Sequence, residues 1–488
     1  MEFSNILRVL SSFFASRNVK AFLVGGVVRD LLLGNLPRDV DLVIEGKAGL
    51  LSQDLATALC GRLVNLDKSR GITRVILQFD TGPLNIDISS IGDSIADNMR
   101  RRDFTINAMA LSLDEDLYSV KRSMVVDCYG GLLDLDTKIL RSLSPTVFKD
   151  DPVRLIRAPR IAIFNNFMIS EETASQIRSD VSLLDRIAPE RTRDEFLKLM
   201  SEPNVRQSLG ILDDLNILSQ IIPEIDQSRD VVQPKEHYWD VFNHLLETVG
   251  MIEMIFDNFS TEDDFVVDCI PRFNDMEDYF DEEITDGHNR KTALKIGALL
   301  HDIAKPITRT VEESGKIRFL GHHSRGAEMS VGVLNRMRFS RKGVELIRLM
   351  VQHHLRPSQM GPVGEMPSGK AIYRYYRDVG DAAIDTLYLN LADYLAARGP
   401  KLEEKEWREH CGIISWILHE GIKSKAPDNL PKLISGHDIM DECGLDPGPE
   451  VGDLLRLVYE AHANGDIDTR IQALDLVKSN LRTGGSGA

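Results

Sequence analysis

The sequence predicts an α+β protein, because strand and helix patterns alternate through about the first 145 residues and helical patterns fill almost all of the rest. At 488 residues the chain is too long for one hydrophobic core, so several domains are expected. Apolar periodicity and turn residues predict the elements of the first part. These are helices over 3–16, 27–33 and 48–63 and strands over 21–24, 39–44, 72–79 and 84–88, with Gly82 and Pro83 as a hairpin turn.

Further along, helices are expected over 196–230, 402–418 and 451–480. An acidic segment, 257–290, reads as an irregular surface excursion, and 484–488 reads as a disordered tail. No run approaches the roughly 20 apolar residues of a membrane span, and no basic stretch followed by an apolar one opens the chain. These features predict a cytoplasmic protein that does not associate with membranes.

The net charge bears on the kind of binding partner, and the cysteine spacing bears on disulfides and zinc sites. The formal net charge of −17 argues against a protein that coats nucleic acid through bulk electrostatics, although it allows a local basic track. The five cysteines are scattered without paired spacing, which indicates buried thiols and not disulfides or zinc ligands.

One stretch near the start carries the first candidate site. An apolar run ends in Gly25 and Gly26 just before a helix, where backbone N–H groups can approach a triphosphate. A strand then carries Asp39 and Asp41, which are two residues apart and share a face. Carboxylates held so close repel each other unless a cation lies between them, and two divalent metals serve this purpose in nucleotidyl transfer. The structural alternative is a glycine turn beside a solvated acidic strand end.

The next polar positions extend this candidate site. Asp87 lies on the later strand and is a candidate third carboxylate, with a solvent-facing strand residue as the alternative. Arg101 and Arg102 suit a triphosphate, because guanidinium is permanently charged and bidentate. Asp103 and Asn107 are four residues apart and could share a helix face toward a ribose.

Two strings in this region carry a resemblance. Gly25–Asp30 (GGVVRD) followed by Asp39–Asp41 (DVD), and then Arg101–Ala108 (RRDFTINA), resemble class II tRNA nucleotidyltransferases and bacterial poly(A) polymerases. The resemblance implies a nucleotidyltransferase head with a mixed sheet, followed by a helical neck, body and tail. It also implies a two-metal transfer of nucleotides to a tRNA 3′ end without a nucleic acid template.

Two further strings fit that family in order. Lys149–Arg157 (KDDPVRLIR) resembles its base-selecting element, so Asp151 and Arg154, expected three apart on one helix, would offer an acceptor and donors to C or A. An ordinary helical ion pair is the alternative for these two. Pro189–Glu195 (PERTRDE) resembles an element that starts a helix and supports the base-reading helix, with Arg191 and Glu195 as an i, i+4 pair.

One departure bears on the product. The chain has only residues 88–100 between the Asp87 strand and Arg101, where many CCA-adding relatives carry a longer flexible loop implicated in the switch from C to A. The resemblance therefore implies that this chain could add CC only.

A second candidate site lies downstream, at the polar ends of apolar segments. The string Leu299–Pro306 (LLHDIAKP) and the histidines around it resemble the HD phosphohydrolase superfamily. Imidazole and carboxylate ligands suit a transition metal or Mg²⁺ in a hydrolytic site. The sequence leaves open His322 or His323 and His353 or His354; we favour the first and the last, from the Gly321-His322 match and the position ahead of Arg356. The expected ligands are His244, His301, Asp302, His322, His354 and Asp393.

Together these observations predict an enzyme that adds C, with or without A, to tRNA from CTP and ATP and also carries an HD site for repair of 3′ ends. Poly(A) polymerase activity, or a hydrolase with a nucleotide-sensing head, are the alternatives. Two Mg²⁺ are expected on Asp39 and Asp41. The resemblance assigns nucleotide contacts to Gly25, Gly26, Arg29, Arg101, Arg102, Asp103, Asn107, Asp151, Arg154 and Arg157. The expected domains are a head (1–145), a neck and body (146–230), an HD domain (231–400) and a helical tail (401–483).

Overall fold

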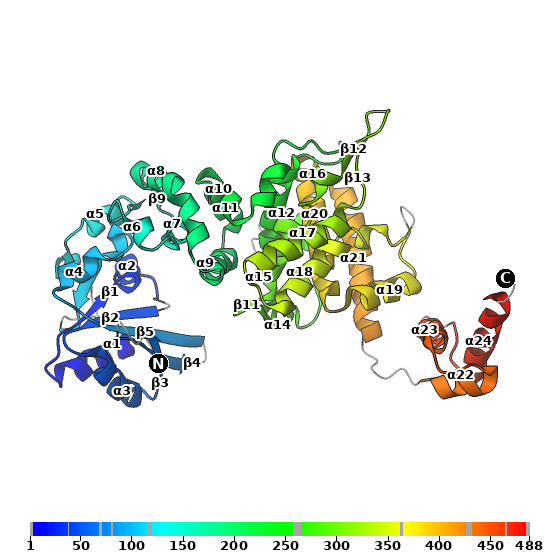
Figure 1. Ribbon diagram of the computed structural model, residues 1–488, viewed down its shortest axis with the longest axis horizontal. Coiled ribbons are helices and arrows are strands. Elements are labelled where there is room, and N and C mark those ends of the chain that lie inside the picture. The colour runs from blue at the N-terminus through cyan, green and yellow to red at the C-terminus, as the bar shows by residue number, and fades with distance from the viewer. Residues whose placement is uncertain are drawn as a thin grey trace. The chain divides into compact units, whose positions relative to one another are not determined.

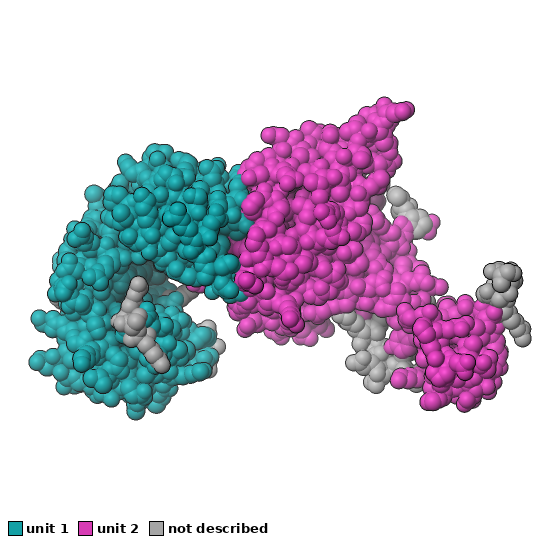
Figure 2. Space-filling model, viewed as in Figure 1, with its two compact units in different colours: residues 1–195, 211–221 teal, residues 196–210, 222–488 magenta. Residues whose placement is uncertain are grey.

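The computed structural model describes residues 3–37, 39–67, 71–79, 82–114, 120–256, 265–361, 365–425, 432–463 and 466–484. The chain folds into two compact units (Figure 2). Unit 1 comprises Met1–Glu195 and Ile211–Ile221, and unit 2 comprises Phe196–Gly210 and Ile222–Ala488. The elements are labelled in Figure 1. Within the described ranges, no helix is both long enough and apolar enough to span a bilayer.

Unit 1 is built on a seven-stranded mixed sheet in the order β3-β4-β5-β2-β1-β6-β7. Only β2 and β5 pair in parallel; the other neighbours are antiparallel. The predicted α+β class with a mixed-sheet head is therefore confirmed. The strands are β1 (Ala21–Val24), β2 (Asp39–Ile44), β3 (Arg62–Asp67), β4 (Ile72–Phe79), β5 (Gly82–Ser90), β6 (Met109–Ser112) and β7 (Val125–Asp127).

Helices flank this sheet and continue beyond it. The helix α2 packs on β1, β2 and β6, and α3 packs on β3, β4 and β5. The helices of this region are α1 (Phe3–Ala15), α2 (Gly26–Leu33), α3 (Ala48–Ala58), α4 (Ile95–Arg100), α5 (Gly131–Asp136), α6 (Val147–Asp150), α7 (Arg154–Phe164), α8 (Glu171–Asp180), α9 (Pro189–Ser201), α10 (Val205–Asp214) and α11 (Ile217–Ile221). A two-stranded pair, β8 (Ile139–Leu140) and β9 (Met168–Ile169), lies among them.

Unit 2 is almost entirely helical. Its core is formed by α12, α15, α17, α18 and α20, which pack on one another through buried aliphatic side chains. The helices are α12 (Val241–Phe256), α13 (Phe265–Asp268), α14 (Met276–Asp281), α15 (Arg290–Leu300), α16 (Lys305–Thr308), α17 (His322–Arg336), α18 (Arg341–His353), α19 (Gly369–Val379), α20 (Ala383–Arg398), α21 (Glu404–Lys425), α22 (Gly436–Cys443), α23 (Pro449–Ala463) and α24 (Arg470–Gly484). The short hairpins are β10 (Glu283–Thr285) with β11 (His288–Asn289) and β12 (Arg309–Val311) with β13 (Ile317–Phe319).

Several predicted helices and turns differ from those in the structure. The helix expected over 48–63 ends at Ala58, because Cys60 adopts a φ of 53° that a helix cannot accommodate, and the strand β3 follows. Gly82 and Pro83 do not form the predicted turn, because they belong to β5 and pair with Phe79 and Gln78. The single helix expected over 451–480 is two helices, α23 and α24.

The prediction for the acidic segment is also wrong where that segment is described. Residues 257–264 lie outside the described residues, but 265–290 form α13, α14 and a hairpin. Phe280 is buried and its ring lies 5.0 Å from that of Tyr388. Arg290 is 2% exposed and is bound by Glu282, Asp381 and Asp385. This part of the segment is therefore a packed portion of unit 2.

The remaining predictions concern cysteines and the tail. Cys60 and Cys128 are exposed and Cys411 is buried, so burial is wrong for the first two; all five thiols are free. Of the tail predicted over 484–488, residues 485–488 lie outside the described residues, whereas Gly484 is the last residue of α24, so the prediction is wrong at that position.

Candidate functional site

The head site begins where β2 and β5 run side by side. Asp41 is aligned with Asp87 across the parallel pair, and Asp39 is aligned with Asn85, whose amide donates to Asp39 at 2.9 Å. Burial raises the pKa of Asp41, and the neighbouring carboxylates of Asp87 and Asp39 raise it further, although Arg102 lowers it. The three carboxylates therefore concentrate negative charge that a bound cation would relieve.

Asp87 differs from the other two carboxylates in its partner. Both of its oxygens accept from the Arg74 guanidinium, at 2.7 and 2.8 Å, across the antiparallel pair β4–β5. Asp87 thus lies beside Asp41 but is already neutralised by a bidentate pair, whereas Asp39 is exposed.

The glycine turn lies directly against these acids. Gly25 caps α2 at a φ of 82° and a ψ of −142°, a conformation that favours glycine. A Cβ at Gly25 would lie 2.2 Å from Arg102 Nη1 and 2.8 Å from Asp41 Oδ2. Only a residue without a side chain lets Arg102 and Asp41 approach the backbone so closely, and the two side chains together offer one group suited to a phosphate and one suited to a metal ion. Gly26 begins α2, whose N-terminal N–H groups face the same turn.

A chain of polar contacts links this turn to the helices that follow. Arg29 donates to Asn107 at 2.9 Å, and Asn107 donates to Asp103 at 3.0 Å. Arg157 lies between Asp103, at 3.3 Å, and Glu195, at 3.5 Å. Burial alone would raise the pKa of Asp103, but Arg157 and Asn107 outweigh it and hold that pKa below its usual value. Four predicted nucleotide-binding residues therefore form one buried network.

The base-selecting pair is arranged differently from the expectation. Asp151 and Arg154 do not share a helix, because α6 ends at Asp150 and Asp151 is extended, at a φ of −152°, ahead of Pro152. Asp151 accepts from Arg191 at 2.9 Å, and Arg154 donates to the Arg101 carbonyl at 3.0 Å. Asp151 Oδ1 and Arg154 Nε are buried without a hydrogen-bond partner among the described residues. One acceptor and one donor thus stay available.

The predicted helix start at Pro189 is confirmed. Arg191 binds Asp151 at 2.9 Å, and Glu195 binds Arg157 and Arg160 at 3.5 and 3.2 Å. These three ion pairs join the helix α9 to the base-selecting region, in line with the supporting role expected of Arg191 and Glu195.

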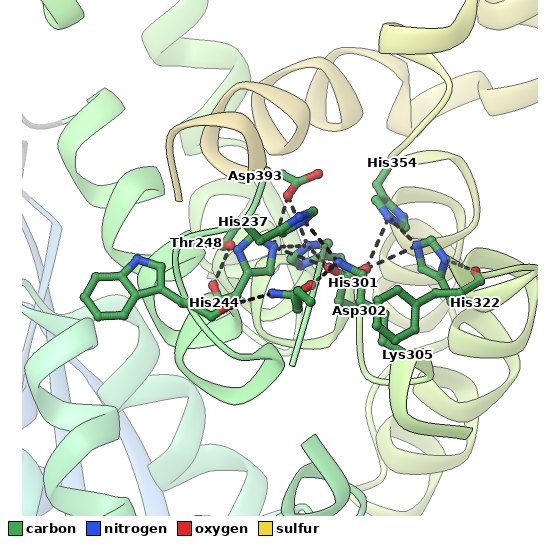
Figure 3. A network of polar contacts seen from close by, with 12 residues as sticks. His237, His244, Thr248, His301, Asp302, Lys305, His322, His354 and Asp393 are labelled. Carbon is green, nitrogen blue, oxygen red and sulfur yellow. Dashed lines mark hydrogen bonds and ion pairs between the residues drawn. The ribbon is translucent and has the colours of Figure 1, made fainter. Parts of the chain in front are cut away.

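The second site lies in the core of unit 2, where the ends of five helices meet. The structure brings all six predicted ligands together (Figure 3). They are His244 on α12, His301 and Asp302 directly after α15, His322 at the start of α17, His354 directly after α18, and Asp393 on α20.

Asp302 lies between two groups of ligands. Its Oδ2 lies 3.3 Å from His244 Nε2 and 3.1 Å from His301 Nε2, while its Oδ1 lies 3.2 Å from His322 Nε2 and 3.6 Å from His354 Nε2. Asp393 completes the first group at 3.0 Å from His244. A carboxylate shared in this way is the arrangement that can bridge two metal ions.

The histidine rings are turned so that their Nε2 atoms face the centre. The Nδ1 atoms of His301, His322 and His354 donate to backbone carbonyls at 2.8, 2.6 and 2.7 Å, each three residues earlier in the chain. Because a carbonyl can only accept, Nδ1 carries the proton and the Nε2 lone pair faces inward. His322 and His354 then place two such lone pairs 3.3 Å apart. This donor set fits a metal cation.

The electrostatics of the second site also favour a bound cation. Burial alone would lower the pKa of His301, but Asp302 and Asp393 outweigh it and raise that pKa to about 10. With no metal bound, Nε2 of His301 therefore holds the second proton of the ring at neutral pH, and a metal ion would take the place of that proton. His323 and His353, which the sequence left open, belong to neither ligand group.

Three residues that the sequence did not single out complete this site. Lys305 lies 2.5 Å from Asp302 Oδ2 and donates to Gln233 at 2.6 Å and to His237 at 3.4 Å. Burial and Lys305 lower the pKa of His237 to about 3, so its ring is neutral. The i, i+3 spacing of Asp302 and Lys305 was a signal that could have identified the lysine.

Comparisons with known proteins agree with both sites. Three family models match in order: "Poly A polymerase head domain" over residues 21–141, "Probable RNA and SrmB- binding site of polymerase A" over 166–228, and "HD domain" over 241–398. An A-adding tRNA nucleotidyltransferase of Deinococcus radiodurans is 29% identical over 94% of this chain and 95% of its own length. A CC-adding tRNA nucleotidyltransferase of Thermus thermophilus is 27% identical over 93% and 92%. This chain belongs to the class II tRNA nucleotidyltransferases.

The fold agrees with that of solved members of the group. A CCA-adding enzyme in complex with ATP matches with a TM-score of 0.64 and 21% identity, over 98% of this chain and 95% of that one. The family models and the two sequence relatives identify this tRNA nucleotidyltransferase as an enzyme that acts at tRNA 3′ ends and carries an HD domain, which disfavours the poly(A) polymerase and nucleotide-sensor alternatives. Because its relatives include both A-adding and CC-adding enzymes, family membership does not fix the nucleotide that it adds.

Proposed function

We propose that this nucleotidyltransferase completes only part of the CCA sequence, adding CC from CTP to tRNA. The connection between the Asp87 strand and Arg101 supports this proposal. The strand β5 ends at Ser90 and α4 already begins at Ile95, which leaves four residues for a loop. An enzyme that must switch from C to A needs a part that can move, and so short a connection offers little room for one.

A second candidate product is the terminal A alone, from ATP. The Deinococcus radiodurans relative, which is A-adding, supports this candidate because its similarity extends over almost the whole chain. In either case the nucleotide is added to a tRNA 3′ end by a single-specificity enzyme.

The head residues would perform the transfer as follows. Asp39 and Asp41 would hold two Mg²⁺, which when bound lower the barrier to attack on the α-phosphate and stabilise the departing pyrophosphate. Gly25 and Gly26 would leave space for the triphosphate, and Arg102, already 3.4 Å from Asp41, would bind its oxygens. The observation that carries the proposal is the close approach of Asp41 and Arg102 to the backbone of Gly25, which would put a metal-binding group and a phosphate-binding group side by side.

The incoming base would be read by the two unsatisfied atoms of the neck. Asp151 Oδ1 can accept from the exocyclic amine of C or A, and Arg154 Nε–H can donate to the neighbouring ring nitrogen. G and U would leave these buried groups unpaired, and an unpaired buried polar group is costly. A buried network would fix the position of this base-reading region relative to the head. Its members are Arg29, Asp103, Asn107 and Arg157.

The HD cluster would be a second active site that hydrolyses phosphate esters at RNA ends. A bound divalent metal pair would supply a water nucleophile at neutral pH. Lys305 is placed to bind a phosphate oxygen, since it lies beside Asp302 at the floor of a cavity of about 410 Å³. In the hydrolysis of a 2′,3′-cyclic phosphate, the water oxygen bonds to phosphorus, one ring P–O bond breaks, and the proton goes to the released ribose oxygen.

The proposed domain boundaries follow from these roles. They are a head over 1–145, a neck and body over 146–230, an HD domain over 231–400 and a tail over 401–483, and each of the three family matches lies inside one of the first three.

The product is tested with three tRNA substrates, ending at the discriminator base, in C, and in CC. Each is incubated with CTP, with ATP and with both, and the product lengths are read on a sequencing gel. We expect CTP to extend the first by two residues and the second by one, with no A added to the third. Addition of A only to the tRNA that ends in CC would establish the second candidate. Efficient synthesis of all of CCA from the first substrate would refute single specificity.

A further inference from the structure

The hairpin β12–β13 lies at the mouth of the HD cavity. Its strands pair Arg309 with Phe319, Thr310 with Arg318 and Val311 with Ile317, and it projects from the helices of unit 2 (Figures 1 and 2). The same cavity of about 410 Å³ is lined by hairpin residues and by the metal-binding Asp302, His322 and Asp393. The hairpin is thus part of the candidate active site.

Basic side chains line this cavity at two levels. Lys305 is 5% exposed and lies at the floor, in contact with Asp302. Lys316 and Arg318 are exposed and belong to the hairpin, and Arg398 comes from the end of α20. Ile317 and Phe319 are half-buried, with the Phe319 ring 5.6 Å from the Lys305 ammonium, so the hairpin turns its apolar face to the floor and leaves its cations at the rim.

The rim cations exceed what one phosphate group needs. The metal ligands and Lys305 suffice for the phosphate that reacts. Of the acidic residues that line the cavity, Asp302 and Asp393 face the metal position, which leaves Glu236 near the rim. Arg318 pairs with Glu312 on the hairpin, and Arg398 lies 3.4 Å from Glu406. Because exposed ion pairs contribute little stability, both guanidinium groups can bind a phosphate in place of a carboxylate, and Lys316 adds a third exposed cation.

We propose that Lys316, Arg318 and Arg398 form a second phosphate subsite, so that the HD site acts on the end of an RNA strand and not on a mononucleotide. This inference rests on the phosphohydrolase activity proposed above. The reacting terminal phosphate lies at the floor and the phosphodiester of the preceding nucleotide lies at the rim. Leu320, which is 71% exposed beside the cations, offers an apolar contact for the sugar or base between them.

The test compares two substrates with the same reacting group. One is cytidine 2′,3′-cyclic phosphate and the other is a tetranucleotide that ends in the same cyclic phosphate. We expect K316A/R318A to raise the KM for the tetranucleotide about tenfold more than the KM for the mononucleotide, because the charge-assisted hydrogen bonds to the second phosphate are removed. The matched control is K405A/R408A, which removes the same two charges from exposed ion pairs on α21, away from the cavity; it should leave both KM values unchanged.

A binding measurement separates this inference from the proposed hydrolysis. Fluorescence anisotropy with a labelled tetranucleotide that ends in a 3′-phosphate is carried out in EDTA, where metal-dependent turnover stops. K316A/R318A should weaken binding about tenfold and lower the slope of log affinity against log salt by about 0.7 for each phosphate that is no longer neutralised. Hairpin-dependent binding without hydrolysis of any ester would refute the proposed activity and leave the subsite standing. Equal effects on the two substrates, or equal effects of the two double variants, would overturn the subsite.

Discussion

Replacing Gly25 with alanine should disable nucleotide addition through geometry alone. The new Cβ would lie 2.2 Å from Arg102 Nη1 and 2.8 Å from Asp41 Oδ2, so both side chains must move by about 1 Å to reach an ordinary contact. A displacement of that size can cost about 100-fold in rate. The backbone conformation of Gly25 adds about 1–3 kcal/mol of strain for a residue with a side chain.

Gly34 provides the matched control for this prediction. It also has a positive φ, 76°, at the end of the same helix, but a Cβ there would meet no heavy atom of the described residues within 4 Å. Gly34→Ala should therefore cost about 1–2 kcal/mol of stability and leave addition within about threefold of the parent.

The assay is the kcat/KM for incorporation of labelled CTP or ATP into truncated tRNA, measured beside urea unfolding of each variant. We expect Gly25→Ala to lose at least about 100-fold in kcat/KM while staying folded. If both glycine variants lost activity to the same extent, strain in α2 and not crowding of the site would be responsible, and the reasoning would fail.

Three more outcomes are expected from the described contacts. Asp39→Ala should abolish addition and keep hydrolysis, and Asp302→Ala should do the reverse, as measured by tRNA extension and by release of phosphate; loss of both activities from either change would contradict two independent sites. Mn²⁺ should raise the melting temperature of the Asp39→Ala protein, followed by calorimetry, and should raise that of Asp39→Ala/His301→Ala less, because binding to the folded state alone stabilises it and the head site is removed from both. Arg290→Met should cost about 3–5 kcal/mol in urea unfolding, since it leaves the buried carboxylate of Asp385 without its guanidinium partner. Arg325→Met, which breaks an exposed pair, should cost about 0–1 kcal/mol, and equal losses would disprove the role of burial.

The ligands of the HD cluster could be found from the sequence because each one lies at the polar end of an apolar segment. The choice between neighbouring histidines could not be made in the same way. Adjacent residues on a helix differ in direction by about 100°, so one of each pair must face away from the centre. His322 is fixed by its bond to the Phe319 carbonyl and His354 by its bond to the Val351 carbonyl, and residue spacing does not reveal which of two adjacent rings takes such an orientation.

The base-selecting pair shows the opposite case, in which a local signal was present and was outweighed. The three-residue spacing of Asp151 and Arg154 suggested a shared helix, but Pro152 disfavours helical geometry at the residue before it. Asp151 is extended as a result, and its partner is Arg191 from a helix 40 residues later. The sequence identified the residue types for this chemistry but could not identify the contacts that hold them.

The two sites place their cation-binding groups by different structural means. This difference explains which of these groups could be predicted from the sequence. In the head, Asp39 and Asp41 are two residues apart on β2, so the sequence itself shows that they share a face. The parallel register of β2 and β5 then aligns Asp41 with Asp87. In the HD cluster, carbonyls one helical turn earlier orient the imidazoles, and the ligands come from five separate helices. In both, repulsion between acids or facing lone pairs is present before any ion binds. The hydrogen bonds and packing around these groups hold them in place, so that an ion would meet a preformed site.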